Sequence, residues 1–130
     1  MKTKSYSMRE ALKPAIIKCL KNQGYKVDIF IQGLSAEKKL CNYIKDTLLE
    51  VGCLFVINIQ SRIFTMPDGG VIRMHCAEDN CSEITTNLLL VDDRINQKHL
   101  IDKIYPRIIP YEYDSGMMLN PKPLFIKVTE

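Results

Sequence analysis

The sequence predicts a single α+β domain preceded by a helix. Segments with apolar residues at helical spacing alternate with short β-branched segments, which is the pattern of a mixed fold. The 130 residues are 46% hydrophobic and 25% charged, typical of a globular protein with one core. No apolar run approaches the roughly 18–20 residues that cross a bilayer, so we expect no membrane contact of that kind.

The first predicted element is a helix over residues 8–22. Ser7 and Glu10 stand three positions apart, as in a capping box. Apolar residues then repeat every fourth position, at Leu12, Ile16 and Leu20. Pro14 has no backbone N–H, so we expect it to kink this helix or delay its start. We predict that residues 1–25 form a basic helical extension and that residues 26–130 form the domain.

A strand–helix–strand unit is predicted next. Residues 27–31 are apolar except at Asp28, as in a covered strand. Residues 35–51 keep helical spacing after a capping Ser35, and Gly52 ends that helix. Residues 53–65 are again apolar and β-branched, which predicts one strand that runs on through this whole segment.

The second half of the chain begins with a hairpin. The turn residues at 67–70 (Pro-Asp-Gly-Gly) predict that a strand at 71–74 folds back on the preceding one. A further strand is predicted at 83–91, a second helix from Asp92 to Tyr105, and a last strand at 124–128.

The predicted order after the first helix is β-α-β-β-α-β, which is the ferredoxin-like arrangement. Such a fold has an antiparallel sheet with both helices on one face. A doubly wound parallel sheet is the alternative, and it requires a helix between residues 53 and 91. Gly69, Gly70 and the β-branched residues around them argue against that helix.

Charge is unevenly distributed along the chain. Residues 1–26 contain seven Lys or Arg and a single acidic residue, Glu10, whereas the chain as a whole carries +3. A basic arm on a mildly acidic body can contact nucleic acid, an anionic surface or an acidic partner. Solubilisation alone is the simpler interpretation, and we prefer it.

The cysteines indicate a reducing compartment. There are five, an odd number, and three of them lie beside apolar residues where a thiol packs as a small hydrophobe. Residues 1–24 lack the continuous apolar core of a secretory signal. We therefore predict a cytoplasmic protein.

A weak metal site is predicted around His75, Cys76 and Cys81. Glu78 and Asp79 lie between the two thiols, and this mixture of ligands suits copper or zinc. The C-x4-C spacing is not that of structural zinc sites, so a polar loop with incidental cysteines is the favoured interpretation. An open copper site completed by a neighbouring subunit is the alternative.

Several short motifs resemble the CutA family of divalent-cation tolerance proteins. They are Gly52-Cys53 before the second strand, Ile63-Phe64, the Pro-Asp-Gly turn and Pro110-Tyr111-Glu112. The chain departs from the family at Ile109, where the family has His, and at Met66-Pro67, where it has Trp. The PII-like signalling proteins share this ferredoxin-like fold.

The resemblance implies a homotrimer with clefts between its subunits. It implies a regulatory or binding role without catalysis, with a divalent metal ion, a nucleotide or a small anion as ligand. Tyr111, Glu112 and Arg62 are the residues we assign to such a cleft. The absence of G-x-S-x-G, H-E-x-x-H and similar motifs also argues against an enzyme.

Two other functions stay open. Ferredoxin-like domains also bind RNA through aromatic residues on the sheet, and Phe30, Phe55, Phe64 and Phe125 fall on predicted strands beside a basic arm. The sequence lacks the RNA-binding signature of those domains, and strand aromatics are more often core. The third possibility is an assembly subunit that binds no small ligand.

Overall fold

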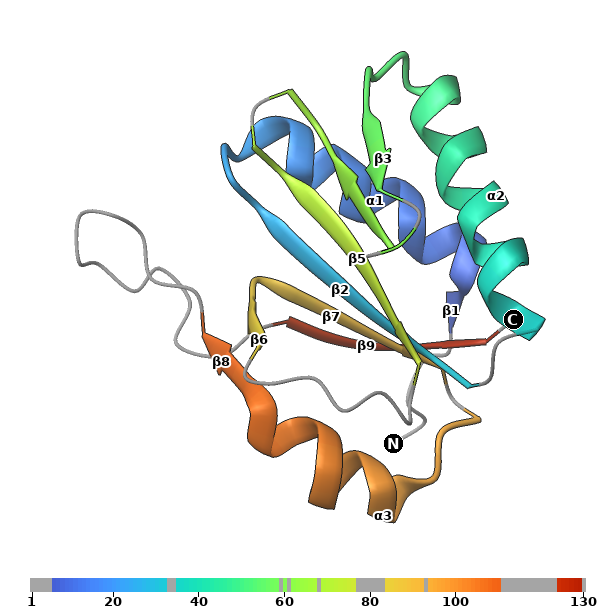
Figure 1. Cartoon of the computed structure of the whole chain (residues 1–130), viewed down its shortest axis with the longest axis vertical. Helices are drawn as coiled ribbons and strands as arrows, with labels where there is room; N and C mark the ends of the chain where they lie inside the picture. The colour runs from blue at the N-terminus through green and yellow to red at the C-terminus, as the bar shows by residue number, and fades with distance from the viewer. Residues whose placement is uncertain are drawn as a thin grey trace.

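The computed structural model describes residues 6–32, 35–58, 60, 62–67, 69–76, 84–92, 94–110 and 124–129. Within these residues, seven strands form one sheet that carries helices on both faces (Figure 1). The chain therefore belongs to the mixed α and β class that the sequence predicts. None of its described helices is long and apolar enough to cross a membrane.

The elements follow one another in a fixed order along the chain. They are β1 (Tyr6–Ser7), α1 (Met8–Lys21), β2 (Lys26–Ile31), α2 (Ser35–Glu50), β3 (Val56–Asn58), β4 (Ile63–Thr65), β5 (Val71–Cys76), β6 (Ile84–Thr86), β7 (Leu88–Asp92), α3 (Gln97–His99), a π-helical turn η1 (Leu100–Ile104), a 3-10 turn η2 (Tyr105–Arg107), β8 (Ile108–Pro110) and β9 (Leu124–Thr129).

The strand order in the main sheet is β1-β9-β7-β2-β5-β4-β3. The five strands from β1 to β5 in this order are parallel, and only β4 and β3 run antiparallel to their neighbours. A ferredoxin-like sheet would instead be antiparallel at every pair. The strand pairing thus differs from the predicted arrangement, although the elements themselves largely agree.

Residues 53–65 explain why the strand pairing differs from the predicted arrangement. The sequence pattern predicts one strand there, but the chain reverses within this segment and forms the antiparallel hairpin β3–β4. The predicted turn at 67–70 is confirmed, since β4 and β5 pair antiparallel and Gly69 has a φ of +88°. Two reversals after α2 bring β5 back parallel to β2, which one reversal would not do.

The predicted strand at 83–91 is also divided. β6 pairs with β8 in a small second sheet, whereas β7 lies beside β2 in the main one. Asn87 separates them, and its side-chain Oδ1 accepts from the backbone N–H of Lys26 at 2.9 Å. The backbone N–H of Asn87 donates to the carbonyl of Lys26, also at 2.9 Å, so this residue ties the start of β7 to the start of β2.

Alternation along β2 divides the core into two clusters. Val27, Ile29 and Ile31 face α1 and α2 in the larger cluster. Phe30 faces the other way, into a smaller cluster under α3, η1 and β6. Because β2 is covered on both faces, all five residues from Val27 to Ile31 are buried.

Helix α1 belongs to the common core and is not merely appended to it. Ser7 caps its N-terminus as predicted, accepting from the backbone N–H of Glu10 at 3.1 Å. The helix begins at Met8 and continues through Pro14, so the predicted delay in its start is wrong. Leu12 and Ile16 are fully buried in the larger cluster.

The second long helix predicted from Asp92 to Tyr105 is shorter and irregular. Asp92 still belongs to β7, and α3 begins after Asn96, whose side chain accepts from the N–H of Lys98. The helix then widens in the π-helical turn η1 and tightens in the 3-10 turn η2 before β8. The sequence also indicates a short strand at 117–119, but these positions lie outside the described residues.

Shortening a buried side chain of α1 is expected to destabilise the whole domain. Ile16→Ala should lower the free energy of unfolding by about 2–5 kcal/mol, because it opens a cavity in the common core. Urea denaturation followed by circular dichroism measures this. Leu20→Ala on the same helix is the control, since Leu20 is 42% exposed and its loss should cost far less. Equal, small effects of the two changes would contradict the integration of α1.

Candidate functional site

A hollow of about 420 Å³ lies between α2 and the β3–β4 hairpin. We call it the α2 hollow. Its lining consists of Glu37, Lys38, Cys41, Asn42, Lys45, Ile57, Arg62 and Met74. The volume falls within the range of small-molecule sites in proteins, roughly 300–1,000 Å³.

Helical spacing explains why α2 contributes most of this lining. Lys38, Asn42 and Lys45 recur at intervals of four and three residues, so they share one side of the helix. The apolar side of α2, with Leu40 and Ile44, is buried against the sheet. The helix therefore directs its polar side to the hollow while its apolar side secures its position.

Arg62 is the most unusual residue of the hollow. Its φ is +59°, and it is the only non-glycine residue with positive φ in the part of the chain that the structure describes. For an ordinary side chain this conformation costs on the order of 1–2 kcal/mol. Glycine would adopt it without strain, so the arginine side chain is present at an energetic cost.

The guanidinium of Arg62 is held in place by groups from two elements. Its Nε lies 2.8 Å from Oε1 of Glu37 on α2, and both side chains are 27% exposed. A second nitrogen donates to the thiol sulfur of Cys76 at 3.8 Å. The carbonyl of Arg62 also accepts from the N–H of Met74, which joins the hairpin turn to β5.

The charge of the α2 hollow is positive. Lys38, Lys45 and Arg62 contribute three positive charges, and Glu37 contributes one negative charge that Arg62 already neutralises. The amide of Asn42 adds donors and an acceptor. This set of groups suits a small anion such as a phosphate or carboxylate, and it offers little to a cation.

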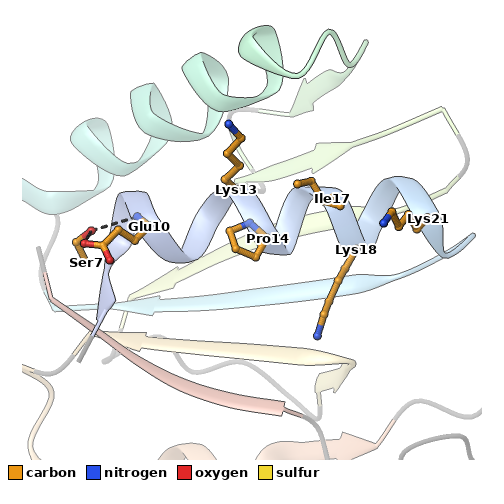
Figure 2. A pocket seen from close by; sticks show the side chains of 7 residues that line it. All are labelled: Ser7, Glu10, Lys13, Pro14, Ile17, Lys18 and Lys21. Atoms are coloured by element: carbon orange, nitrogen blue, oxygen red, sulfur yellow. Dashed lines mark hydrogen bonds between the residues drawn. The ribbon is translucent and has the colours of Figure 1, made fainter. Parts of the chain in front are cut away.

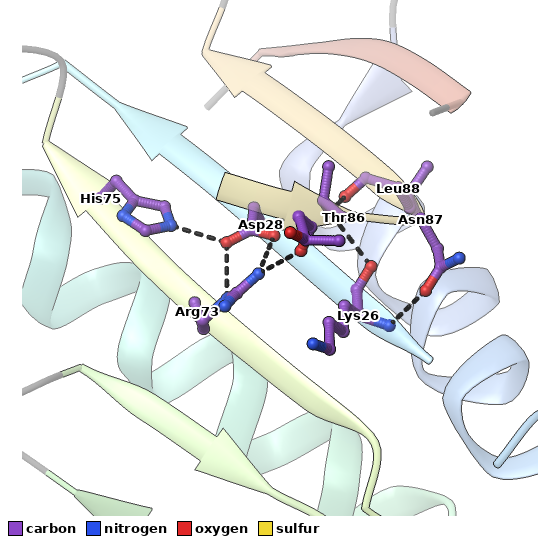
Figure 3. A network of polar contacts seen from close by, with 8 residues as sticks. Lys26, Asp28, Arg73, His75, Thr86, Asn87 and Leu88 are labelled. Atoms are coloured by element: carbon purple, nitrogen blue, oxygen red, sulfur yellow. Dashed lines mark hydrogen bonds and ion pairs between the residues drawn. The ribbon is translucent and has the colours of Figure 1, made fainter. Parts of the chain in front are cut away.

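A buried polar network lies on the opposite face of the sheet (Figure 3). We call it the Asp28 network. Asp28 on β2 receives both Nε and one terminal nitrogen of Arg73 at 2.8 Å, and Nε2 of His75 lies 2.7 Å from Oδ1. Arg73 also donates to the backbone carbonyl of Thr85 at 2.7 Å, which connects β5 to β6.

The neighbours of Asp28 make it a stable carboxylate. Burial alone would raise its pKa, but the hydrogen bonds from His75 and Arg73, together with their charge, lower the pKa below the ordinary 3.8. The ring of His75 also stacks on Phe30, with centroids 4.8 Å apart. The Asp28 network is thus a set of mutually satisfied groups that joins β2, β5 and β6.

A second buried carboxylate closes the ends of β2 and β7. Asp92 accepts from the backbone N–H groups of Gln32 at 3.2 Å and of Arg94 at 3.0 Å. The side chain of Arg94 binds the same carboxylate at 2.7 Å, and these bonds lower the pKa of Asp92 although its burial acts to raise it. Gly33, which stands where phosphate-binding loops often have glycine, lies outside the described residues.

The predicted site residues are separated by the sheet. Arg62 lies in the α2 hollow, as a cleft residue should. His75 faces the Asp28 network and Cys76 faces the larger core cluster, because adjacent residues of a strand point to opposite faces. Cys81, Tyr111 and Glu112 lie outside the described residues, so their roles stay predictions.

Only His75 and Cys76 of the predicted copper or zinc site fall within the described residues. Nowhere in that part of the chain do three or more His, Cys, Asp or Glu side chains come close enough to hold a metal ion. Nε2 of His75 is already engaged with Asp28, and the nearest predicted thiol is on the other face. Because Cys81 lies outside the described residues, the metal site stays a prediction.

The outer face of α1 offers a second surface (Figure 2). A shallow, open hollow of about 960 Å³ follows this face and is lined by Ser7, Glu10, Lys13, Pro14, Ile17, Lys18 and Lys21. Lys13 reaches toward α2, where its Nζ lies 3.0 Å from Oε1 of Glu50, and Lys18 points to the other side of the helix. The face combines an apolar centre with a basic border.

Comparisons with known proteins leave the family of this chain open. No family model matches it, and no curated protein matches it either.

The Asp28 network is expected to contribute strongly to stability. Asp28→Asn should lower the free energy of unfolding at pH 7 by about 3 kcal/mol, because it leaves the partly buried charge of Arg73 without its partner. Asp46→Asn on the exposed side of α2 is the control and should change it by no more than about 0.5 kcal/mol. Urea denaturation measures both.

The stabilisation that Asp28 provides should also depend on pH. The pKa of Asp28 is lowered in the folded state, so its contribution is present in full well above about 3.8 and is lost as the pH falls through the folded-state pKa. The difference in unfolding free energy between wild type and Asp28→Asn should therefore narrow as the pH falls from about 5 to about 2. A difference that stays constant over this range would contradict the ionised state of Asp28.

Proposed function

We propose that this chain is a non-catalytic binding protein whose small anionic ligand occupies the α2 hollow. The observation that carries the proposal is Arg62, an arginine in a left-handed backbone conformation with its guanidinium in a basic hollow. Strained residues of this kind concentrate at ligand sites, where the surrounding structure compensates the strain.

The ligand class follows from the groups that line the hollow. Arg62, which Glu37 and Cys76 hold in place, brings a positive guanidinium that attracts a phosphate or carboxylate. Lys38 and Lys45 add charge from α2 without fixed geometry. Ile57 and Met74 provide apolar surface on the sheet side. A small organic molecule with one or two anionic groups matches this combination better than a bare ion does.

The resemblance to CutA and PII-like proteins is compatible with a binding role. It is the source of the proposed absence of catalysis, and it also implies a homotrimer. The homotrimer stays a prediction of that resemblance. The α2 hollow does not depend on it, because one chain supplies all the lining residues described above.

Substitution of Arg62 by glycine separates ligand binding from folding. Arg62→Gly suits the backbone at this position, so the melting temperature should change little, while affinity should fall roughly tenfold or more with the loss of a charge-assisted hydrogen bond worth about 1.5–3 kcal/mol. Arg62→Lys should restore part of the affinity. Titrations with inorganic pyrophosphate and with citrate, followed by amide NMR shifts, measure the dissociation constants.

Lysine variants provide the matched control. Lys45→Gln should weaken the binding of the same anions. Lys98→Gln on α3 should leave their binding unchanged, because Lys98 lies outside the hollow. Amide shifts confined to residues 37–45 and 62 support the site. If neither anion shifts these amides in the wild-type protein, the proposal fails.

A second candidate function is nucleic-acid binding along α1. Lys13, Lys18 and Lys21 all line the hollow on α1, and of these Lys18 points away from α2 (Figure 2). Lysine contacts of this type bind phosphates without sequence preference.

Salt dependence tests this candidate. The double change Lys18→Glu and Lys21→Glu should lower the affinity for labelled single-stranded RNA at least tenfold. It should also reduce the slope of log affinity against log salt concentration by about 2, since roughly two phosphate contacts are lost. Fluorescence anisotropy over a range of NaCl concentrations measures both quantities. The double change Lys98→Glu and Lys103→Glu is the charge-matched control. Equal effects of the two pairs, or no RNA binding by the wild type, would exclude α1 as the interface.

A further inference from the structure

The main sheet ends at β3 with an apolar edge. Across the described residues, no strand pairs with the outer side of β3, which is the last strand in the sheet order. Leu54 is 79% exposed and Val56 is 73% exposed, the two highest values among the large hydrophobic side chains of the described chain. Large apolar side chains on an open sheet edge indicate a surface that another strand covers.

Hydrogen bonds within the hairpin show which backbone groups point outward. The backbone N–H of Met66 donates to the carbonyl of Gly70, and the N–H of Met74 donates to the carbonyl of Arg62. The even-numbered residues along β4 and β5 therefore direct their backbone groups toward each other, between these two strands. Ile63 and Thr65 therefore bond toward β3, where they oppose Asn58 and Val56. Ile57, between these two, must turn its N–H and C=O to the outside.

The sequence of this edge lacks the protection that native edges usually have. Residues 53–60 read Cys-Leu-Phe-Val-Ile-Asn-Ile-Gln and contain no charged residue, no proline and no glycine. Exposed edges are normally blocked by lysine, proline or a bulge, and an uncharged β-branched segment pairs readily with another strand. No charge, proline or glycine in this segment opposes such pairing.

We infer that β3 pairs antiparallel with β3 of a second copy of this chain, across a twofold axis at the sheet edge. In an antiparallel pair, two facing residues exchange both of their backbone hydrogen bonds. The outward N–H and C=O of Ile57 can do this with the same groups of the second copy, so the edge is complementary to itself.

Side-chain chemistry also favours a second copy as the occupant. Ile57 packs toward the larger core cluster, whereas Leu54 and Val56 alternate to the open face. In the pair, these exposed side chains meet only uncharged residues of the second edge, so no like charges oppose each other. The combined sheet would continue from one copy into the other and cover both edges.

Oligomer size and a single surface substitution test the inference. Native mass spectrometry and light scattering over a concentration series should show a dimer for the wild-type chain. Val56→Lys adds a charge to the edge and should raise the dimer dissociation constant at least tenfold without changing the circular dichroism spectrum. Ile101→Lys is the matched control, because Ile101 is 50% exposed on η1, away from β3, and its dimer should persist.

A second measurement keeps the inference testable if Val56→Lys folds poorly. Hydrogen exchange at the Ile57 amide should slow as the wild-type concentration rises, and Leu54→Glu should abolish that concentration dependence. A monomer at all concentrations, or a trimer, would overturn the twofold pairing. A dimer that withstands both Val56→Lys and Leu54→Glu would place the interface elsewhere and overturn it as well. None of these outcomes depends on ligand binding in the α2 hollow.

Discussion

Asp28 is a carboxylate in the middle of a strand that is buried on both faces, and this placement constrains the sheet around it. A buried carboxylate needs an opposite charge and hydrogen-bond donors nearby, because it has no contact with water. Arg73 supplies both, and the register of β2 and β5 sets these two residues directly opposite each other. A shift of one residue would turn Asp28 toward the apolar helices and separate the pair.

The same register organises the second face of the sheet. Two residues further along the strands, Phe30 lies opposite His75, and their rings stack. Arg73 extends to the carbonyl of Thr85 and so attaches β6, which β8 then joins. One buried charge thus aligns two central strands and gives the smaller cluster a polar border. On the other face, the apolar residues of β2 are left entirely to α1 and α2.

The hairpin β3–β4 connects the two surfaces that we propose to be functional. Its turn residue, Arg62, binds Glu37 of α2, and both residues line the α2 hollow. Its outer strand carries Ile57, whose side chain lines the hollow and whose backbone forms the open edge. A partner on that edge would therefore stiffen one wall of the hollow, which links assembly to ligand binding through a single strand.

Local sequence patterns predicted the elements well. The capping pair Ser7 and Glu10, the apolar stripe of α2 and the turn after β4 each depend on residues within a few positions of one another, and the structure confirms them. Where local chemistry was ambiguous, the prediction was wrong. A β-branched run cannot show where a strand reverses, so the hairpin within residues 53–65 was missed. Asn87 similarly divided a run that read as one strand.

By itself, the sequence determined the mixed α and β class, most helix and strand positions, and the basic character of the N-terminal segment, because each follows from short-range spacing and composition. Strand order and the sites were decided only by the tertiary structure. Asp28 and Arg73 are 45 residues apart in sequence, and Arg62 and Glu37 are also far apart along the chain. A buried Asp signals that a partner must exist, but only the packed sheet identifies which of the 18 basic residues that partner is.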